Sequence, residues 1–117
     1  MKNILVFGIL MIASYFTASG QTNAGLSDTM TAKFKVYGNC GMCEKRIEKA
    51  AKIEGVYFAD WSEETLILTI KFDLKKVKPS QVEKAVAAVG HDTQHVRADD
   101  AVYANLHSCC QYERRKD

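Results

Sequence analysis

Two cysteines separated by two residues, Cys40 and Cys43, are the residues of this 117-residue chain whose type and spacing most directly suggest chemistry. They stand between a segment with strand periodicity and a segment with helical periodicity. A helix N-terminus stabilises thiolates, because its unpaired N–H groups and its dipole attract negative charge. Gly38 and Gly41 allow the backbone to bend sharply there. Residues 36–43 are therefore predicted to present two sulfurs at one point.

Thiolates in this arrangement have three competing uses. Cu(I) and Hg(II) are soft ions that accept two sulfur ligands, whereas Zn(II) prefers four ligands. The same pair could act as a redox dithiol or close a structural disulfide. A disulfide between Cys40 and Cys43 would close a very small loop, and adjacent Cys109 and Cys110 would strain a bond between them. Metal binding, with Cu(I) first and Hg(II) or Zn(II) as alternatives, is the favoured interpretation.

Other soft or imidazole donors lie further along the chain. His91 follows a glycine at the end of the second predicted helix and is a candidate third ligand or protonatable group. His107, Cys109 and Cys110 form a compact set near the C-terminus. This set is either a second metal locus, an arm that folds over the first, a disulfide or a packed helix face. Met42 offers a thioether that more often packs than ligates.

The periodicity of the apolar residues predicts the elements that carry these donors. Alternation predicts strands over 31–37, 56–61, 65–72 and 93–97, and helical spacing predicts helices over 42–53 and 79–90. Asp99 or Asp100 could cap a further helix that continues towards Cys110. The order βαββαβ indicates an α+β ferredoxin-like fold, in which two helices cover one face of a four-stranded antiparallel sheet, followed by a C-terminal helical extension.

The N-terminal residues have the layout of a secretory signal peptide. Lys2 precedes an apolar run of about thirteen residues, fewer than the roughly 20 that span a bilayer, and small residues lead to a cleavage point after Gly20. The expected organisation is a signal peptide over 1–20, a flexible lead-in over 21–30, one domain over 31–98 and a Cys/His-containing tail over 99–117. A formal charge of +2 gives no argument for nucleic acid binding.

The element order, together with Gly38-Asn39-Cys40-Gly41-Met42-Cys43 in the first loop, resembles the heavy-metal-associated domain family. That family includes copper chaperones, metal-binding modules of copper-transporting ATPases and the periplasmic mercury-binding protein. The resemblance covers roughly Thr31 to Arg97 and implies that Cys40 and Cys43 are the ligands. It departs in two places. The family usually has a Met, packed beneath the loop, where this chain has Gly38, and the loop after the second helix reads Gly90-His91 instead of Gly-Tyr or Gly-Phe.

These observations predict a non-enzymatic, exported protein, located in the periplasm, that binds a soft metal through Cys40 and Cys43 and passes it on by thiolate exchange. The expected partner is a membrane metal transporter or another exported metalloprotein, and two exposed loops could also share one metal in a homodimer. The mature protein is not expected to be embedded in a membrane. The rival is a thiol–disulfide oxidoreductase, but the thioredoxin type needs a proline near the dithiol, and the only proline, Pro79, is predicted to start a helix.

Overall fold

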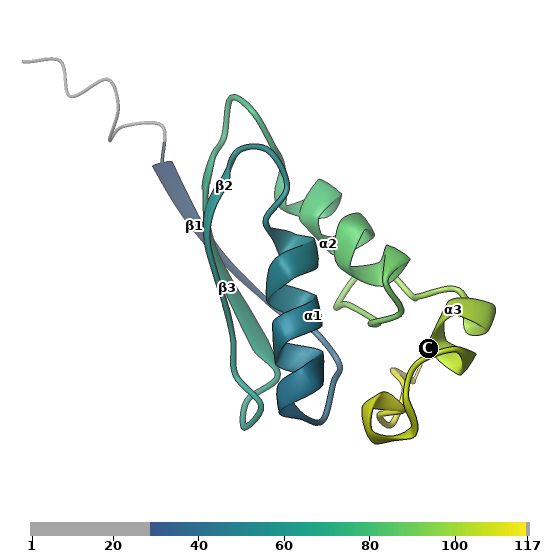
Figure 1. The fold of residues 1–117 in the computed structure, drawn as a ribbon. Coiled ribbons are helices and arrows are strands. Elements are labelled where there is room, and N and C mark those ends of the chain that lie inside the picture. The colour runs from purple at the N-terminus through teal and green to yellow at the C-terminus, as the bar shows by residue number, and fades with distance from the viewer. Residues whose placement is uncertain (1–28, 117) are drawn as a thin grey trace, which may run out of the picture.

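The computed structural model describes residues 29–116, so the predicted signal peptide and most of the predicted lead-in lie outside the described residues. The elements follow one another as shown in Figure 1: β1 (Thr29–Lys35), α1 (Gly41–Ala51), β2 (Val56–Trp61), β3 (Ile67–Asp73), α2 (Pro79–Ala88), α3 (Asp100–Ala104) and a turn of 3₁₀-helix, η1 (Ser108–Cys110). None of the helices between residues 29 and 116 is long and apolar enough to cross a membrane.

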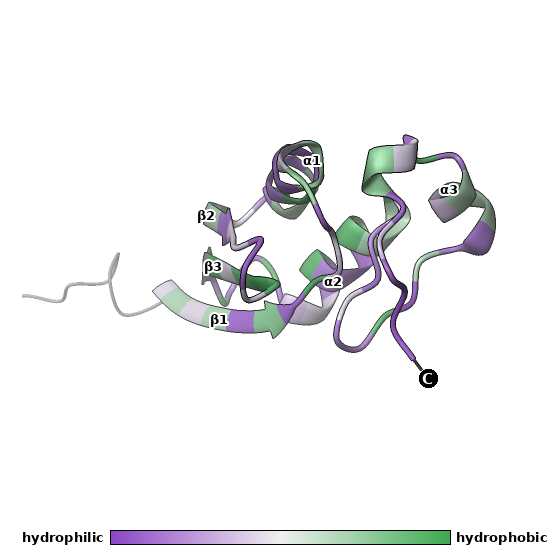
Figure 2. Cartoon of the chain, turned by 90° about the horizontal axis from the view of Figure 1, so that it is seen from below, coloured by the Kyte–Doolittle hydropathy of each residue, from purple (hydrophilic) through white to green (hydrophobic). Residues whose placement is uncertain are grey.

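The strands form an antiparallel sheet in the order β1-β3-β2. Phe34 of β1 lies opposite Leu68 of β3, and Ala59 of β2 lies opposite Ile70 of β3. All four of these side chains are buried. The alternation of hydrophobic and hydrophilic residues along β1 is visible in Figure 2, and it explains why one face of the sheet accepts α1 and α2 (Figure 1).

Each long helix contributes an apolar stripe to the core. In α1 the buried residues are Cys43, Ile47 and Ala51, which follow the spacing of one helix face. In α2, Val82 and Val86 are fully buried. Cys43 is thus a core residue as well as a member of the Cys-x-x-Cys pair. The first turn of α1 is therefore anchored to the rest of the fold.

The predicted fourth strand over 93–97 is wrong for the described part of the chain. Only a single bridge, between Val36 and Thr93, continues the sheet beyond β1. The chain turns back instead, because the backbone N–H of Thr93 donates to the carbonyl of Val96 at 2.7 Å and the Thr93 hydroxyl also bonds Val96. The carboxylate of Glu83 in α2 holds this turn by accepting from the Thr93 hydroxyl and the His95 backbone.

The segment after residue 98 is less helical than the sequence suggests. The side chain of Asp99 accepts from the N–H of Ala101 at 2.8 Å and starts α3, which ends already at Ala104. The helix therefore does not continue to Cys110, and the expectation of a helix that reaches this residue is wrong. Instead the chain returns alongside the loop that follows α2, where Leu106 lies against Gly90.

Candidate metal site

The loop between β1 and α1 is held on three sides. The N–H of Val36 donates to Leu66 at 2.8 Å, and the N–H of Tyr37 donates to the carbonyl of Asp92 at 2.9 Å. The indole Nε1 of Trp61 donates to the carbonyl of Val36 at 2.9 Å. Buried backbone groups that are satisfied in this way fix the path of a loop. The residues that follow, up to Cys40 at the N-terminal end of α1, are therefore positioned before any metal arrives.

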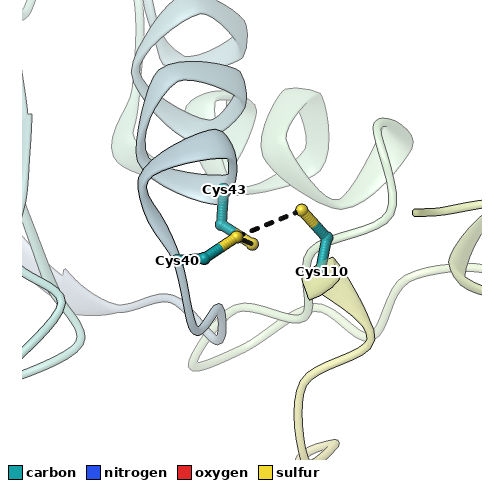
Figure 3. A group of neighbouring side chains, drawn as sticks. All are labelled: Cys40, Cys43 and Cys110. Carbon is teal, nitrogen blue, oxygen red and sulfur yellow. Dashed lines mark hydrogen bonds between the residues drawn. The ribbon is translucent and has the colours of Figure 1, made fainter. Parts of the chain in front are cut away.

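Three sulfur atoms meet at this end of α1. The Sγ atoms of Cys40 and Cys43 lie 3.3 Å apart, and that of Cys40 lies 3.4 Å from the Sγ of Cys110. All three lie within 4.8 Å of one another, and all the cysteines between residues 29 and 116 are free thiols. Figure 3 shows Cys110 pointing from the C-terminal segment towards the first turn of α1. The structure thus brings together the predicted pair and one of the tail cysteines.

The two cysteines of the pair differ in their protonation. Burial opposes ionisation of Cys40, whose side chain makes no regular cap hydrogen bond at the start of α1. The nearby backbone N–H of Cys43 and the thiols of Cys43 and Cys110 favour the thiolate more strongly than burial opposes it, and they lower the pKa of Cys40 to about 7. Burial raises the pKa of Cys43 to about 12. The Cys43 thiol also faces Asn39, whose Oδ1 lies 3.5 Å from its sulfur. Cys40 is therefore the thiolate that is available first.

His91 lies against the loop between β1 and α1 and is completely buried. Its Nδ1 donates to the carbonyl of Tyr37 at 2.8 Å, its Nε2 lies 3.5 Å from a guanidinium nitrogen of Arg46, and its ring stacks on Tyr112. Burial lowers the pKa of His91, so the ring is neutral. Both nitrogens have partners here, and His91 is not one of the three grouped donors; its predicted role as a ligand stays a prediction.

The remaining predicted donors are exposed. The sulfur of Cys109 lies 3.9 Å from that of Cys110 and 3.7 Å from the thioether sulfur of Met42. The hydrogen bond to Cys110 raises the pKa of the Cys109 thiol. His107 is exposed, and its carbonyl accepts from the N–H of Cys110 at 2.8 Å. Within residues 29–116, neither His107 nor Cys109 belongs to the sulfur group that includes Cys110.

The residues that hold the tail in place were not predicted from the sequence. The hydroxyl of Tyr112 accepts from the N–H of Asp92 at 2.7 Å and donates to the carbonyl of Gly90 at 2.6 Å. Asp92 is completely buried and accepts two hydrogen bonds from Arg114. The periodicity of apolar residues carries no information on contacts between residues twenty or more positions apart. The one feature of the sequence that could have indicated these contacts is the acidic residue Asp92, which lies close to a predicted core helix and needs a partner if it is buried.

A second group of donors consists of the carboxylates of Glu44, Glu48 and Asp60. It has a structural explanation, because Glu48 accepts from the backbone N–H of Trp61 at 3.0 Å and so ties α1 to β2. Carboxylates at a surface gather in this way without a metal. The sulfur group is therefore the candidate site.

The fold and this site together define a small α+β domain that presents paired thiols at the start of its first helix. Residues 35–92 match the family model of the heavy-metal-associated domain. The chain belongs to the heavy-metal-associated domain family, as the motif around Cys40 and Cys43 suggested. A search of curated protein sequences gives no significant match.

Solved structures agree with this assignment. The CopZ metallochaperone is 32% identical, with a TM-score of 0.53, and the match covers 55% of this chain and 98% of that protein. Oxidised MerP from Ralstonia metallidurans CH34 is also 32% identical, with a TM-score of 0.53 and coverage of 56% and 94%. The Cu(I)-loaded N-terminal domain of a potential copper-translocating P-type ATPase from Bacillus subtilis is 30% identical, with a TM-score of 0.54 and coverage of 63% and 95%.

Proposed function

We propose that this protein is an exported, non-enzymatic carrier or scavenger of a soft metal, which it binds as Cu(I) through Cys40 and Cys43 and releases by thiolate exchange. The observation that carries the proposal is the pair of sulfurs 3.3 Å apart at the N-terminal end of α1. Two thiolates satisfy a soft d¹⁰ ion, and a loop fixed by the fold needs little rearrangement to bind it. Hg(II) fits the same donors, whereas Zn(II) requires additional ligands.

The relatives support copper as the first choice. One is a metallochaperone by name, and another is a P-type ATPase domain solved in its Cu(I)-loaded state. Both have the domain that this chain has, and both are at least 30% identical to it. A carrier of this family would meet a membrane metal transporter or another exported metalloprotein, and Cu(I) shared between two loops would give a homodimer.

The exposure of the site suits ligand exchange. Cys40 is partly exposed, whereas Cys43 is buried, and Met42 between them is 46% exposed. An incoming thiolate can therefore reach a metal from the side of Cys40 while Cys43 still holds it. Transfer through such shared intermediates avoids the slow release of Cu(I) into water.

Titration of the reduced protein with Cu(I) under anaerobic conditions, in competition with a chromophoric chelator, tests the proposal. The wild type is expected to take one tight equivalent, and Cys40→Ser and Cys43→Ser are expected to lose it. Cys109→Ser is the matched control, because it removes an exposed thiol outside the pair. If the wild type cannot compete with the chelator, or if both pair variants compete as well as the wild type, the copper proposal is wrong.

A double variant distinguishes a carrier from a thiol–disulfide oxidoreductase. In an oxidoreductase, Cys40 would attack and Cys43 would resolve, but the Cys110 thiol lies 3.4 Å from that of Cys40 and could resolve in its place. An oxidoreductase with Cys43→Ser and Cys110→Ser combined would therefore accumulate mixed disulfides with other proteins. A carrier loses metal instead and forms no such adducts. Non-reducing gel electrophoresis of extracts of this double variant gives the answer. Pro79 is the first residue of α2, as predicted, which argues against the thioredoxin type.

Export is tested by expressing the full chain and fractionating the cells. The proposal expects the protein in the periplasm with Gln21 as its first residue. N-terminal sequencing of the exported product checks the cleavage point. Accumulation of the uncleaved chain in the cytoplasm would contradict the proposed location without affecting the proposed metal site.

A further inference from the structure

The C-terminal segment delivers a third sulfur to the site. The Sγ of Cys110 lies 3.4 Å from that of Cys40, and Cys110 is as fully buried as Cys43. Cys110 lies outside residues 35–92, the part of the chain that matches the family model. The solved CopZ metallochaperone is matched over 98% of its length by only 55% of this chain. This third thiol is therefore an addition to the domain that those relatives share.

The position of Cys110 is fixed by contacts that do not involve metal. The hydroxyl of Tyr112, two residues after Cys110, bridges the backbone groups of Gly90 and Asp92. Arg114, four residues after Cys110, donates two hydrogen bonds to the carboxylate of Asp92. Arg114 also donates to the carbonyl of Ala98 at 2.6 Å. We call residues 105–115 the C-terminal arm. Its sulfur is placed by a buried, charge-assisted network and not by chance collapse onto the surface.

The aromatic contacts of the arm point to the same conclusion. The ring of Tyr112 stacks on His91, with ring centroids 5.3 Å apart, and meets the edge of Tyr103 at 5.0 Å. The hydroxyl of Tyr103 in turn donates to the carbonyl of Tyr112 at 2.6 Å. Tyr112 is thus held by one residue of the loop after α2 and by one residue of α3. A segment ordered to this degree has already lost the conformational entropy that recruitment of a ligand would otherwise cost.

The spacing of the sulfurs suits one soft ion. With metal–sulfur bonds of about 2.3 Å, three sulfurs around a trigonal ion lie about 4.0 Å apart. The three sulfurs here lie within 4.8 Å of one another, with two of the separations at 3.3 and 3.4 Å. Each of these two separations would have to grow by about 0.6–0.7 Å to admit the ion, and side-chain rotation can supply this movement. Their protons would leave to solvent as the ion binds.

We propose that Cys40, Cys43 and Cys110 form a three-thiolate site for a single soft cation, with the C-terminal arm as the part of the protein that closes it. The proposal rests on the proposed function, because it takes Cu(I) binding by the pair as given. It adds a consequence for transfer: a partner's thiolate that reaches the metal from the side of Cys40 must still displace Cys110 before the metal can leave. The protein therefore holds its cargo more tightly than a two-thiolate carrier would.

X-ray absorption spectroscopy of the reduced protein with one equivalent of Cu(I) tests this directly, without any mutation. Three sulfur neighbours are expected in a sample that sedimentation velocity shows to be monomeric. Two sulfur neighbours in the wild type, or three that appear only in a dimer, would overturn the proposal. Failure of the wild type to bind Cu(I) at all would instead reject the underlying function, so the two failures are distinguishable.

Variants of the adjacent tail cysteines give a second, independent readout. In the chelator competition, Cys110→Ser is expected to lower the Cu(I) affinity at least 10- to 100-fold, since loss of even an outer contact to a metal ligand has this effect. Cys109→Ser, one position away and exposed, is expected to leave the Cu(I) affinity unchanged. Circular dichroism confirms that both variants are folded. Equal affinities for Cys110→Ser and the wild type, or an equal loss in both variants, would overturn the assignment of Cys110.

Discussion

Arg114 contacts the carboxylate of Asp92 through two hydrogen bonds, from Nε to Oδ2 at 3.0 Å and from Nη2 to Oδ1 at 2.8 Å. Asp92 has no exposed surface, and its Oδ1 also accepts from the N–H of Ala98 at 2.8 Å. This pair joins the end of the family domain to the C-terminal arm. The arm that carries Cys110 therefore depends on the buried charge of Asp92, which precedes Cys110 by 18 residues in the chain.

Replacing Asp92 with Asn tests how much this pair stabilises the fold. Removing one partner of a buried ion pair leaves the other without compensation, and Arg114 is only 15% exposed. We expect Asp92→Asn to lower the free energy of unfolding by about 3 kcal/mol, the low end of the usual range, because Arg114 keeps some contact with water. Urea denaturation followed by circular dichroism measures the change.

The matched control is Asp100→Asn. Asp100 also pairs with Arg114, but its side chain is 85% exposed, and surface pairs contribute about 0–1 kcal/mol. The control should therefore unfold within about 1 kcal/mol of the wild type. Equal losses in the two variants would show that the burial of Asp92 has no special role in holding the arm.

The same pair predicts the response of the protein to acid. Burial alone would raise the pKa of Asp92, but the hydrogen bonds from Arg114 and Ala98 and the charge of Arg114 hold this pKa below its ordinary value of 3.8. The folded state thus binds its proton less readily than the unfolded state. The stabilisation is complete above the ordinary pKa and is lost as the pH falls from about 4 towards the lower pKa of the folded state.

Urea midpoints measured across a series of pH values check this expectation. The difference in stability between the wild type and Asp92→Asn should be largest near neutral pH and should shrink as the pH falls below about 4. A difference that stays constant down to the lowest accessible pH would mean that Asp92 does not titrate with the fold.

The unequal pKa values of the cysteine pair predict unequal reactivity. Because the thiolate is the nucleophile, Cys40, with a pKa of about 7, should react with iodoacetamide long before Cys43, with a pKa of about 12. The rate at Cys40 should rise with pH and reach half of its maximum near pH 7. Tandem mass spectrometry assigns the label within the tryptic peptide that follows Lys35 and ends at Lys45. Faster labelling of Cys43 would reverse the assignment of the leading thiolate.

The elements near the pair could be predicted because each is encoded locally. The apolar spacing of Cys43, Ile47 and Ala51 is a helix pattern that the core then uses, and the alternation in β3 places Leu68 and Ile70 on the buried face. Local patterns and tertiary packing agree in these segments, so the pattern alone is sufficient.

The fourth strand and the arm could not be predicted in this way. The residues from Thr93 to Arg97 alternate as in a strand, but the carboxylate of Glu83 in α2 accepts a hydrogen bond from the Thr93 hydroxyl and stabilises a turn there. The position of Cys110 depends on the ion pair between Asp92 and Arg114. The periodicity of the sequence does not reveal a pair of residues so far apart in the chain. Sequence reasoning could mark Cys110 as a donor, but only the tertiary structure places it beside Cys40.

Trp61 packs against Gly38 of the cysteine loop, the position at which the family was expected to have a Met. A Cβ atom added to Gly38 would lie 3.0 Å from Cζ2 of Trp61 and 3.1 Å from Cβ of Cys43, both tighter than ordinary contacts. The indole is fixed there by its hydrogen bond to the carbonyl of Val36. A side chain at position 38 would therefore press against the indole of Trp61 and the Cβ of Cys43.

This relationship predicts that Gly38→Ala destabilises the protein by about 1–3 kcal/mol, the usual cost of overpacking. Gly41→Ala is the control, because a Cβ at Gly41 meets nothing within 4 Å and lies in the first turn of α1. It should be neutral or slightly stabilising. Urea denaturation of both variants measures the difference.

A double-mutant cycle with Trp61→Phe then identifies the cause of the loss. Trp61→Phe alone should cost about 1–3 kcal/mol, because the buried carbonyl of Val36 loses its indole donor. The smaller ring leaves room for a methyl group at position 38, so Gly38→Ala should cost less in this background than in the wild type. Costs that simply add would mean that the steric conflict lies with Cys43, and Gly38→Ala would then weaken Cu(I) binding in both backgrounds.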